Sequence, residues 1–425
     1  MNLLRKIIGK NSSIRKNFLA LDIGTEFVKA LIFYFDQEIN KAVIIGAGKA
    51  RQGIGNMTSG AVSDIEGTIS ICRRAISQAE NMAEVSSPSE AIMGIAGEFV
   101  KGTTTTVHYE RTQPEIRIDP IELKNIVHKV QWKAFDRIKR QMAWETGNSE
   151  IDVKLINAAV VDVKIDGYKV TNPINFQGRE VTLSIFNAYA PMVHLGALHL
   201  ISEELDLKLS SIAAEPYAVV RSMDVENDSD FSAIFIDIGG GTTDVAVVKN
   251  GSLEGTVMYA LGGRSFTRRI SNDLGLTMED AERLKVRYGH GDLSPQVAQR
   301  LEKVLENDCQ VWLSGLEVAL ESFVDGKIDL LPSRILLCGG GAGLPGIVNS
   351  IEKAYWYEEK RLPFAKKPTI GFIQPRDVVN VVDQTGFLRT PQDVTPMALA
   401  NLMFNSPKEE KILSEALKKA VKMNN

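Results

Sequence analysis

Cysteine is scarce in this sequence of 425 residues, which contains only Cys72, Cys309 and Cys338. They lie far apart and form no CxxC pair, so the sequence predicts neither a thiolate metal site nor a disulfide framework and fits a reducing compartment. No apolar run approaches the roughly 20 residues of a membrane-spanning helix. The first ten residues, MNLLRKIIGK, place basic residues inside their apolar stretch and so lack the core of a signal peptide. We therefore expect the protein in the cytoplasm.

A strong charge of either sign is also missing. The formal net charge is −4, which gives no reason to expect binding to nucleic acid. Hydrophobic residues make up 44% and charged residues 24% of the chain, the mixture of an ordinary soluble globular protein. The length allows two or more domains, each with its own core.

Glycine-rich turns between apolar strands are the most informative feature that the sequence does contain. In AIFIDIGGGTTDVAVV, residues 233–248, a strand reaches Asp237 and a turn of small residues follows before the next strand. Glycine lets the backbone approach a ligand, and inward-pointing N–H groups bind phosphate oxygens. A carboxylate at the strand end suits hydrated Mg²⁺. We predict a phosphate site whose binding residues here are Gly239, Gly240, Gly241, Thr242 and Thr243.

A matching turn lies near the start of the chain, in FLALDIGTEFVKALIFYF, residues 18–35. Asp22 and Asp237 are separated by about half the chain, and such a repeat predicts two similar domains that face each other. Asp22 is the second predicted Mg²⁺ ligand. Gly24 and Thr25 are predicted to contact the other side of the phosphates, with Lys29 as a further contact. A single bend of this kind is usually structural, but two matched copies favour phosphate binding.

Two further stretches fit the same site. RILLCGGGAGLPGIVNSI, residues 334–351, predicts a strand, a turn at Gly339, Gly340 and Gly341 that contacts a nucleoside, and a helix from Pro345. A lone glycine run of this kind would be weak support. In SSIAAEPYAVV, Glu215 is predicted to orient a water molecule for attack on a phosphate. Alone, it would be an acidic residue at a helix start.

Two weaker signals complete the predicted site. Gly262 and Gly263 precede a helix and are predicted to approach a ribose or a phosphate. Glu282 and Lys285 lie three residues apart on a predicted helix, where they would bracket the ribose and adenine. An ordinary surface ion pair explains this spacing equally well. The four tryptophans, Trp132, Trp144, Trp312 and Trp356, are predicted to lie in the core or in contacts between subdomains.

Together these motifs resemble those of the actin-like ATPase superfamily. LDIGTEFVKAL and IDIGGGTTDVAV are similar to its two phosphate motifs, LCGGGAGLPGI to its adenosine motif and AAEPYAVV to its first connecting segment. INAAVVDVKIDGYKVTNPINFQGREV and LGGRSFTRRISNDLGLTMEDAERLKVRYG resemble two subdomains of the FtsA family of bacterial cell-division proteins, and the resemblance extends over residues 18–404. A small residue often replaces Glu215 in that family, so the level of hydrolysis stays open.

The resemblance implies an α/β fold, in which two duplicated RNase H-like (actin-like) domains surround a nucleotide cleft and an FtsA-type α+β subdomain is inserted in the first half. It implies six parts of the chain: a basic amphipathic tail, residues 1–16; a first actin-like domain, residues 17–100 with 191–230 and 380–404; the inserted subdomain, residues 101–190; a second actin-like domain, residues 231–260 with 330–379; a small subdomain, residues 261–329; and an amphipathic C-terminal tail, residues 405–425.

The resemblance also implies a function. Such a protein binds ATP with Mg²⁺, with at most slow hydrolysis in which Asp22, Glu215 and Asp237 take part. It polymerises, binds the C-terminal peptide of FtsZ, and lies on the cytoplasmic face of the membrane at the division site. The C-terminal tail, with its apolar stripe from Ile412 to Val421 between lysines, fits a helix on an anionic membrane surface. It also fits a helix that docks on the protein body.

Two other functions remain open at this point. A pilus-assembly platform of the PilM kind would share the same motifs and bind the cytoplasmic peptide of a membrane partner. An actin-fold enzyme, such as a sugar kinase or an Hsp70-like ATPase, would share the phosphate turns. The sequence shows neither a sugar-binding insert nor a peptide-binding domain after the ATPase motifs.

Overall fold

The structure is a computed structural model of the chain. It describes residues 16–86, 88–97, 100–147, 151–225, 228–324, 328–359 and 361–405. Apart from their innermost residues, Lys16 and Asn405, the two predicted tails lie outside the described residues.

The first sheet has six strands in the order β11-β6-β1-β2-β3-β17. Its central strand, β1, is almost wholly apolar, as expected for a strand covered on both faces. Antiparallel pairing joins β1 to β2 and β2 to β3, whereas β6 and β11 run parallel on the other side of β1. The strands are β1 (Asn17–Ile23), β2 (Phe27–Asp36), β3 (Lys41–Arg51), β6 (Glu90–Ile95), β11 (Lys208–Ala214) and β17 (Val381–Asp383).

The second sheet has nine strands in the order β16-β15-β12-β13-β14-β7-β10-β8-β9. Its strands are β7 (Lys101–Glu110), β8 (Val153–Ile165), β9 (Tyr168–Lys169), β10 (Glu180–Pro191), β12 (Ala233–Ile238), β13 (Thr243–Lys249), β14 (Ser252–Tyr259), β15 (Arg334–Cys338) and β16 (Thr369–Phe372). A short hairpin of β4 (Met57–Thr58) and β5 (Ala61–Val62) stands apart from both sheets.

The predicted duplication is visible in the strand order. In the first sheet, β1-β2-β3 form an antiparallel meander and β6 and β11 lie parallel beside β1. In the second, β12-β13-β14 form the same meander, and β15 and β16 lie parallel beside β12. Each glycine turn of the sequence repeat joins the first two strands of its meander. The two halves therefore share one topology, and the predicted α/β fold with two related domains is confirmed.

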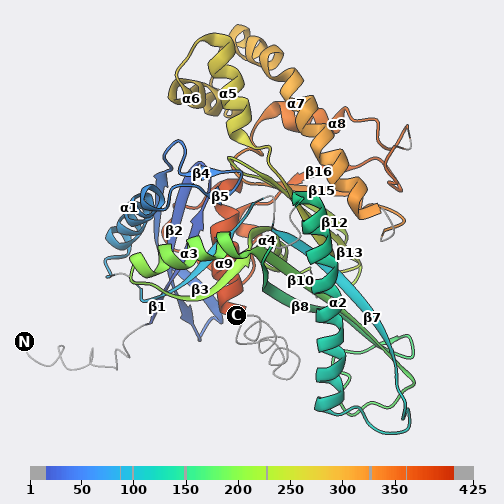
Figure 1. The fold of residues 1–425 in the computed structure, drawn as a ribbon. Helices are drawn as coiled ribbons and strands as arrows, with labels where there is room; N and C mark the ends of the chain where they lie inside the picture. Colours follow the sequence, from blue (N-terminus) through green and yellow to red (C-terminus); the bar gives the residue numbers. More distant parts are fainter. Residues whose placement is uncertain are drawn as a thin grey trace, which may run out of the picture.

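Helices cover the two sheets and separate them in space (Figure 1). Alternate residues of β12 enter two different apolar cores, with Phe235 facing the first sheet's core and Ile234 and Ile236 facing α5 to α8. The helices are α1 (Ile65–Ala83), α2 (Pro120–Thr146), α3 (Met192–Glu204), α4 (Glu215–Arg221), α5 (Gly263–Leu274), α6 (Met278–Gly289), α7 (Pro295–Val324), α8 (Pro345–Glu352) and α9 (Val394–Asn405), with 3-10 turns η2 (Pro375–Asp377) and η3 (Pro391–Asp393).

The inserted segment continues the second sheet. Within it, β7, β10, β8 and β9 lie side by side and α2 covers one face (Figure 1). β7 joins the insert to β14 through Gly102 and Thr103. The sequence predicts the α+β character of this segment, but not that its strands extend the sheet of the other half.

Local sequence signals explain several features of the fold. Asp119 caps α2 by accepting the N–H of Glu122 at 2.7 Å. The two-residue turn between β13 and β14 has both Asn250 and Gly251 at positive φ, as a type I′ turn requires. Trp312 and Trp356 are buried, as predicted.

The prediction for the other two tryptophans is wrong. Trp132 is 70% and Trp144 is 85% exposed. Both lie on α2, whose buried stripe consists of smaller aliphatic residues, including Ile126, Val127 and Val130. The large rings therefore lie outside the contact between this helix and the sheet.

Candidate functional site

The two glycine turns lie against each other where the halves of the chain meet. A Cβ atom added to Gly240 would lie 2.9 Å from the Glu26 Cβ atom, and one added to Gly241 would lie 2.6 Å from the Thr25 hydroxyl oxygen. Only glycine allows this approach of the second turn to the first. The structure thus brings the first turn, with Gly24 and Thr25, to the second, although they are far apart in the sequence.

Four buried carboxyl groups gather behind these turns. Asp22 is 4%, Glu215 is 8%, Asp237 is 7% and Asp244 is 3% exposed. Asp22 and Asp237 lie next to the last residues of β1 and β12. Asp244 lies at the start of β13, and Glu215 begins α4 after β11. These carboxyl groups carry more negative charge than Lys29, which lies among them, can neutralise.

Burial and mutual repulsion perturb three of these groups. Burial, followed by the negative charges of Asp22, Asp244 and Asp237, holds the pKa of Glu215 well above its ordinary value. Burial and the charge of Asp237 likewise raise the pKa of Asp244 well above its usual range. The pKa of Asp237 is also raised by burial, although the hydroxyl of Thr395 donates to its Oδ2 at 2.6 Å and opposes the shift.

Lysines partly offset this charge. The Lys29 ammonium donates to Asp22 Oδ2 at 3.0 Å and to the carbonyl of Gln392 at 2.7 Å. Burial alone would lower the pKa of Lys29, but Asp22, with help from Asp237, raises it. Lys49 donates to the side chain of Gln392 at 2.8 Å, and burial together with the Lys29 charge lowers its pKa. An ammonium has three donors, so Lys29 keeps one for a ligand.

The start of α5 holds the second turn in place. The N–H of Gly263 donates to the carbonyl of Gly239 at 2.9 Å, and the N–H of Arg264 donates to the carbonyl of Gly240 at 2.8 Å. A Cβ atom on Gly262, the residue before this helix, would lie 2.7 Å from the Gly239 oxygen. Gly262 and Gly263 therefore support the second glycine turn directly.

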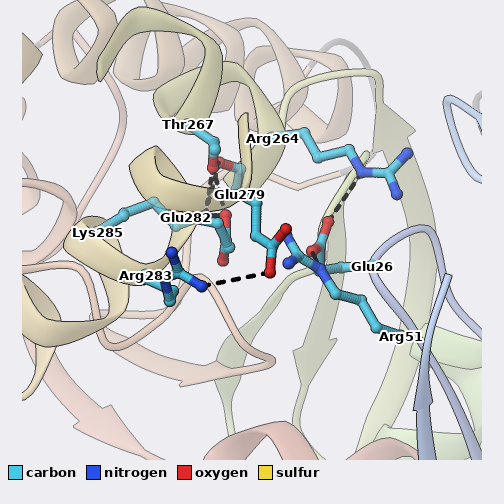
Figure 2. A network of polar contacts seen from close by, with 9 residues as sticks. Glu26, Arg51, Arg264, Thr267, Glu279, Glu282, Arg283 and Lys285 are labelled. Atoms are coloured by element: carbon cyan, nitrogen blue, oxygen red, sulfur yellow. Dashed lines mark hydrogen bonds and ion pairs between the residues drawn. The ribbon is translucent and has the colours of Figure 1, made fainter. Parts of the chain in front are cut away.

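Glu282 and Lys285 form an ion pair at 2.8 Å, with each side chain 12% exposed, so the surface-pair explanation does not fit. Lys285 also donates to the carbonyl of Gly263 and to the hydroxyl of Thr267, each at 2.8 Å (Figure 2). Through Gly263, this pair links α6 to the turn at Gly239.

The third glycine turn, residues 339–341, packs against Asp237 and Ile238 at the end of β12. Gly339 has φ +83°, and a Cβ atom there would lie 2.1 Å from Asp237 Oδ1. The N–H of Gly341 donates to the carbonyl of Ile238 at 2.7 Å. On its other side the turn contacts η3. Gly340 lies beside Gln392, and the N–H of Gly339 donates to the carbonyl of Pro391. The predicted nucleoside turn therefore borders the carboxyl cluster.

An ion-pair bridge connects the two halves next to the turns. Glu26 accepts from Arg264 on α5 through Oε2 and from Arg51 at the end of β3 through Oε1, both at 2.9 Å (Figure 2). Glu26 and Arg264 are largely buried, whereas the Arg51 side chain is 41% exposed. We call Glu26, Arg51 and Arg264 the interdomain bridge.

Thr243 is placed differently from the other predicted residues. Its hydroxyl donates to the carbonyl of Leu261 at 2.6 Å and accepts from the Trp312 indole N–H at 2.9 Å, and the residue is fully buried. Thr243 thus anchors its strand to α7. Its neighbour Thr242 remains in the turn, with its hydroxyl 3.5 Å from Asp244 Oδ2.

Several site residues do not appear among the predicted ones. Asp244 carries a visible signal, since it is the second aspartate of the DIGGGTTD motif. Gln392 contacts Lys29 and Thr395 contacts Asp237, each more than 150 residues away in the sequence, and only the fold brings them together. Glu26 and Arg264 give no motif that sequence reasoning could have used.

The donor set fits a hydrated divalent cation. Asp244 Oδ1 is buried and has no hydrogen-bond partner among the described residues. Over the same part of the chain, no group of three His, Cys, Asp or Glu side chains converges closely enough to hold a metal ion directly. Mg²⁺ usually keeps several of its waters, so carboxylates at a distance of one water layer suit it better than a closed cage.

Comparison with known proteins shows what this chain is similar to. A family model described as "Cell division protein FtsA" matches residues 234–396. FtsA of Neisseria meningitidis is 26% identical over 354 residues, covering 79% of this chain and 81% of that protein. FtsA of Pseudomonas aeruginosa is 23% identical over 437 residues, covering 96% of this chain and 98% of the relative. The chain is FtsA-like.

A solved structure extends the comparison to the fold. The FtsA-like chain superposes on a chain of the "PilM-PilN type IV pilus biogenesis complex" with a TM-score of 0.62. The match covers 90% of this chain and 97% of that one at 17% identity, so it shows the fold alone. In the described part of the FtsA-like chain, no helix is both long enough and apolar enough to cross a membrane.

Proposed function

We propose that the chain is an ATP-binding, actin-like cell-division protein that polymerises and tethers FtsZ to the cytoplasmic face of the membrane at the division site. The observation that carries the proposal is the meeting of two duplicated glycine turns over four buried carboxyl groups, in a chain similar to FtsA over almost its whole length. The six predicted domains and their boundaries are part of this proposal.

In this proposal the glycine turns bind the phosphates of ATP and the carboxyl groups bind the Mg²⁺. Backbone N–H groups of residues 239–241, with Thr25 and Thr242, would bind phosphate oxygens. Asp22 and Asp237 would hold the hydrated Mg²⁺, and Asp244 supplies a third carboxyl group nearby. The positive charge of the cation would offset the negative charge of these carboxyl groups. Gly339, Gly340 and Gly341 would contact the nucleoside, with the Glu282–Lys285 pair beside it.

Glu215 limits what the site can do chemically. Burial and the surrounding carboxylates raise its pKa and so favour its protonated form, which cannot accept a proton from an attacking water. A bound cation would offset the neighbouring negative charges, and this would lower the pKa of Glu215 and favour its ionised form. We therefore propose slow hydrolysis at most, with Glu215 orienting water, and assembly rather than turnover as the main output.

The proposed partners are those that the resemblance to the FtsA family implies. The proposal assigns FtsZ binding, through the FtsZ C-terminal peptide, to the small subdomain of residues 261–329. It assigns self-assembly to the folded body and membrane attachment to the amphipathic tail of residues 405–425, on anionic lipid. No nucleic acid is proposed as a partner.

Co-pelleting with liposomes tests the proposal. FtsZ from the same organism is mixed with anionic liposomes, ATP and Mg²⁺, and either the full chain or a chain lacking residues 408–425. We expect FtsZ in the pellet only with the full chain. FtsZ that stays in solution while the full chain pellets would contradict the tether.

A PilM-like platform is the second candidate, favoured by the structural match to the PilM–PilN complex. Such a protein would bind the cytoplasmic peptide of a membrane partner instead of FtsZ. In the same assay, binding to liposomes without recruitment of FtsZ would favour this candidate. ATP turnover stimulated by a small substrate would instead support an actin-fold enzyme or kinase.

A further inference from the structure

One edge of β7 is left open beyond its first residues. Along its other edge, β7 pairs with β10 over its whole length. On the open side, within the described part of the chain, β14 pairs with β7 only at Gly102 and Thr103. The hydroxyl of Thr104 donates to the carbonyl of Leu253 on β14 and marks the point where the two strands separate.

A cavity of about 380 Å³ lies at this edge, between residues 104–106 of β7 and one side of α2. Successive side chains of a strand point to opposite faces of its sheet. A cavity that contacts three successive residues therefore lies at the edge of the strand and not on either face. Unpaired N–H and C=O groups at such an edge are a template for another strand.

Unsatisfied polar groups occur where α2 packs on the sheet. Thr105 lines the cavity, but its hydroxyl is itself buried and has no hydrogen-bond partner among the described residues. On α2, both amide atoms of Gln131 are likewise buried and unpartnered.

The charge of the cavity restricts what the ligand can be. Its α2 side is formed by Lys133, Asp136, Arg137 and Arg140. Asp136 pairs with Arg140, which leaves Lys133 and Arg137 as an excess of positive charge. Neither Lys133 nor Arg137 has an ion-pair partner among the described residues, and a strand edge beside two such cations is complementary to an extended chain with acidic side chains.

We propose that the groove between α2 and residues 104–106 of β7 binds an extended acidic peptide segment of a partner protein, which adds to the sheet as a further strand. Backbone hydrogen bonds to β7 supply the attachment, and Lys133 and Arg137 select acidic side chains. The groove uses neither the glycine turns nor the small subdomain at residues 261–329, so this surface is separate from the site proposed for ATP and from that proposed for FtsZ.

Fluorescence anisotropy with short labelled peptides tests the groove. The probe alternates valine and glutamate; one comparison peptide replaces glutamate with lysine, and another keeps the glutamates but has proline at its centre. We expect the first probe to bind and the lysine peptide not to bind. Because proline cannot donate its N–H to a strand, the proline peptide is expected to bind at least about tenfold more weakly. Equal binding of both acidic peptides would overturn strand addition.

Variants locate the binding on the protein. Lys133→Glu with Arg137→Glu is expected to weaken binding about tenfold, because two ion pairs become repulsions. The matched control, Lys124→Glu with Lys139→Glu, makes the same charge change at exposed positions of α2 outside the cavity and is expected to bind normally. Hydrogen exchange should show protection of residues 104–106 by the probe.

Two outcomes would overturn the proposal. The first is a loss of binding of equal size in both double variants, since this would mean that the peptide only senses the net charge of the protein. The second is self-association of the unliganded protein, measured by sedimentation, that the Lys133→Glu and Arg137→Glu changes abolish. The edge would then pair with a second copy of this chain.

Discussion

Replacement of Asp244 by asparagine is expected to stabilise the protein in the absence of nucleotide and divalent cations. Asp244 is almost fully buried, its Oδ1 has no partner among the described residues, and its Oδ2 lies 3.5 Å from the Thr242 hydroxyl. A buried polar group left without a partner costs about 1–3 kcal/mol, and more when it is charged. Asparagine keeps the shape and a polar group but removes the charge, so we expect a gain of about 1 kcal/mol, at the lower end of this range.

The pH dependence gives this prediction its sign. Burial and Asp237 raise the pKa of Asp244 in the folded protein above the value of about 3.9 expected in the unfolded chain. The folded protein therefore binds the proton of the Asp244 carboxyl group more tightly than the unfolded chain does. The stability that this protonated group contributes is complete below the unfolded pKa and is lost as the pH rises through the folded pKa. The advantage of Asp244→Asn should therefore be small near pH 4 and grow as the pH rises.

Thermal unfolding in EDTA at several pH values measures this effect. A change of 1 kcal/mol shifts the Tm of a domain of about 150–250 residues by about 2–4 °C. The exposed Asp230→Asn is the matched control and should leave the Tm unchanged at every pH. With ATP and Mg²⁺ present, we expect Asp244→Asn to gain less stability than the unmodified protein. A lower Tm for Asp244→Asn at high pH in EDTA, or a gain that does not change with pH, would refute the reasoning.

Three further predictions concern packing and the interdomain bridge. The Gly241→Ala variant is expected to lose the thermal stabilisation by ATP and Mg²⁺, because the added Cβ atom would enter the first turn. The control Gly343→Ala should keep this stabilisation, since its Cβ atom would have no heavy atom within 4 Å. Glu26→Gln should lower stability by about 1–3 kcal/mol, because the largely buried Arg264 loses its charged partner, and should speed the release of a fluorescent ATP analogue. Arg264→Met combined with it should add little, and additive effects would argue against the bridge. Trp356→Ala should cost about 3–5 kcal/mol in denaturant unfolding, and a loss under 1 kcal/mol would contradict its place in the core.

Much of the fold follows from short-range patterns. The apolar run before Asp22 and the one before Asp237 predict strands, and the glycines after them predict turns. Both predictions are confirmed because strands covered on both faces need apolar residues at nearly every position. The N-cap at Asp119 and the turn at Asn250 are equally local, since each depends on a few neighbouring residues.

The sequence alone determined the repeat, the glycine turns and the resemblance to FtsA, because these depend on residue type and spacing along the chain. Tertiary structure decided which groups meet around them. It brought Thr395 to Asp237, Arg264 to Glu26, and β7 to the edge of β14. Contacts between residues so far apart follow from how the sheets and helices pack, and no local pattern of residues encodes that packing.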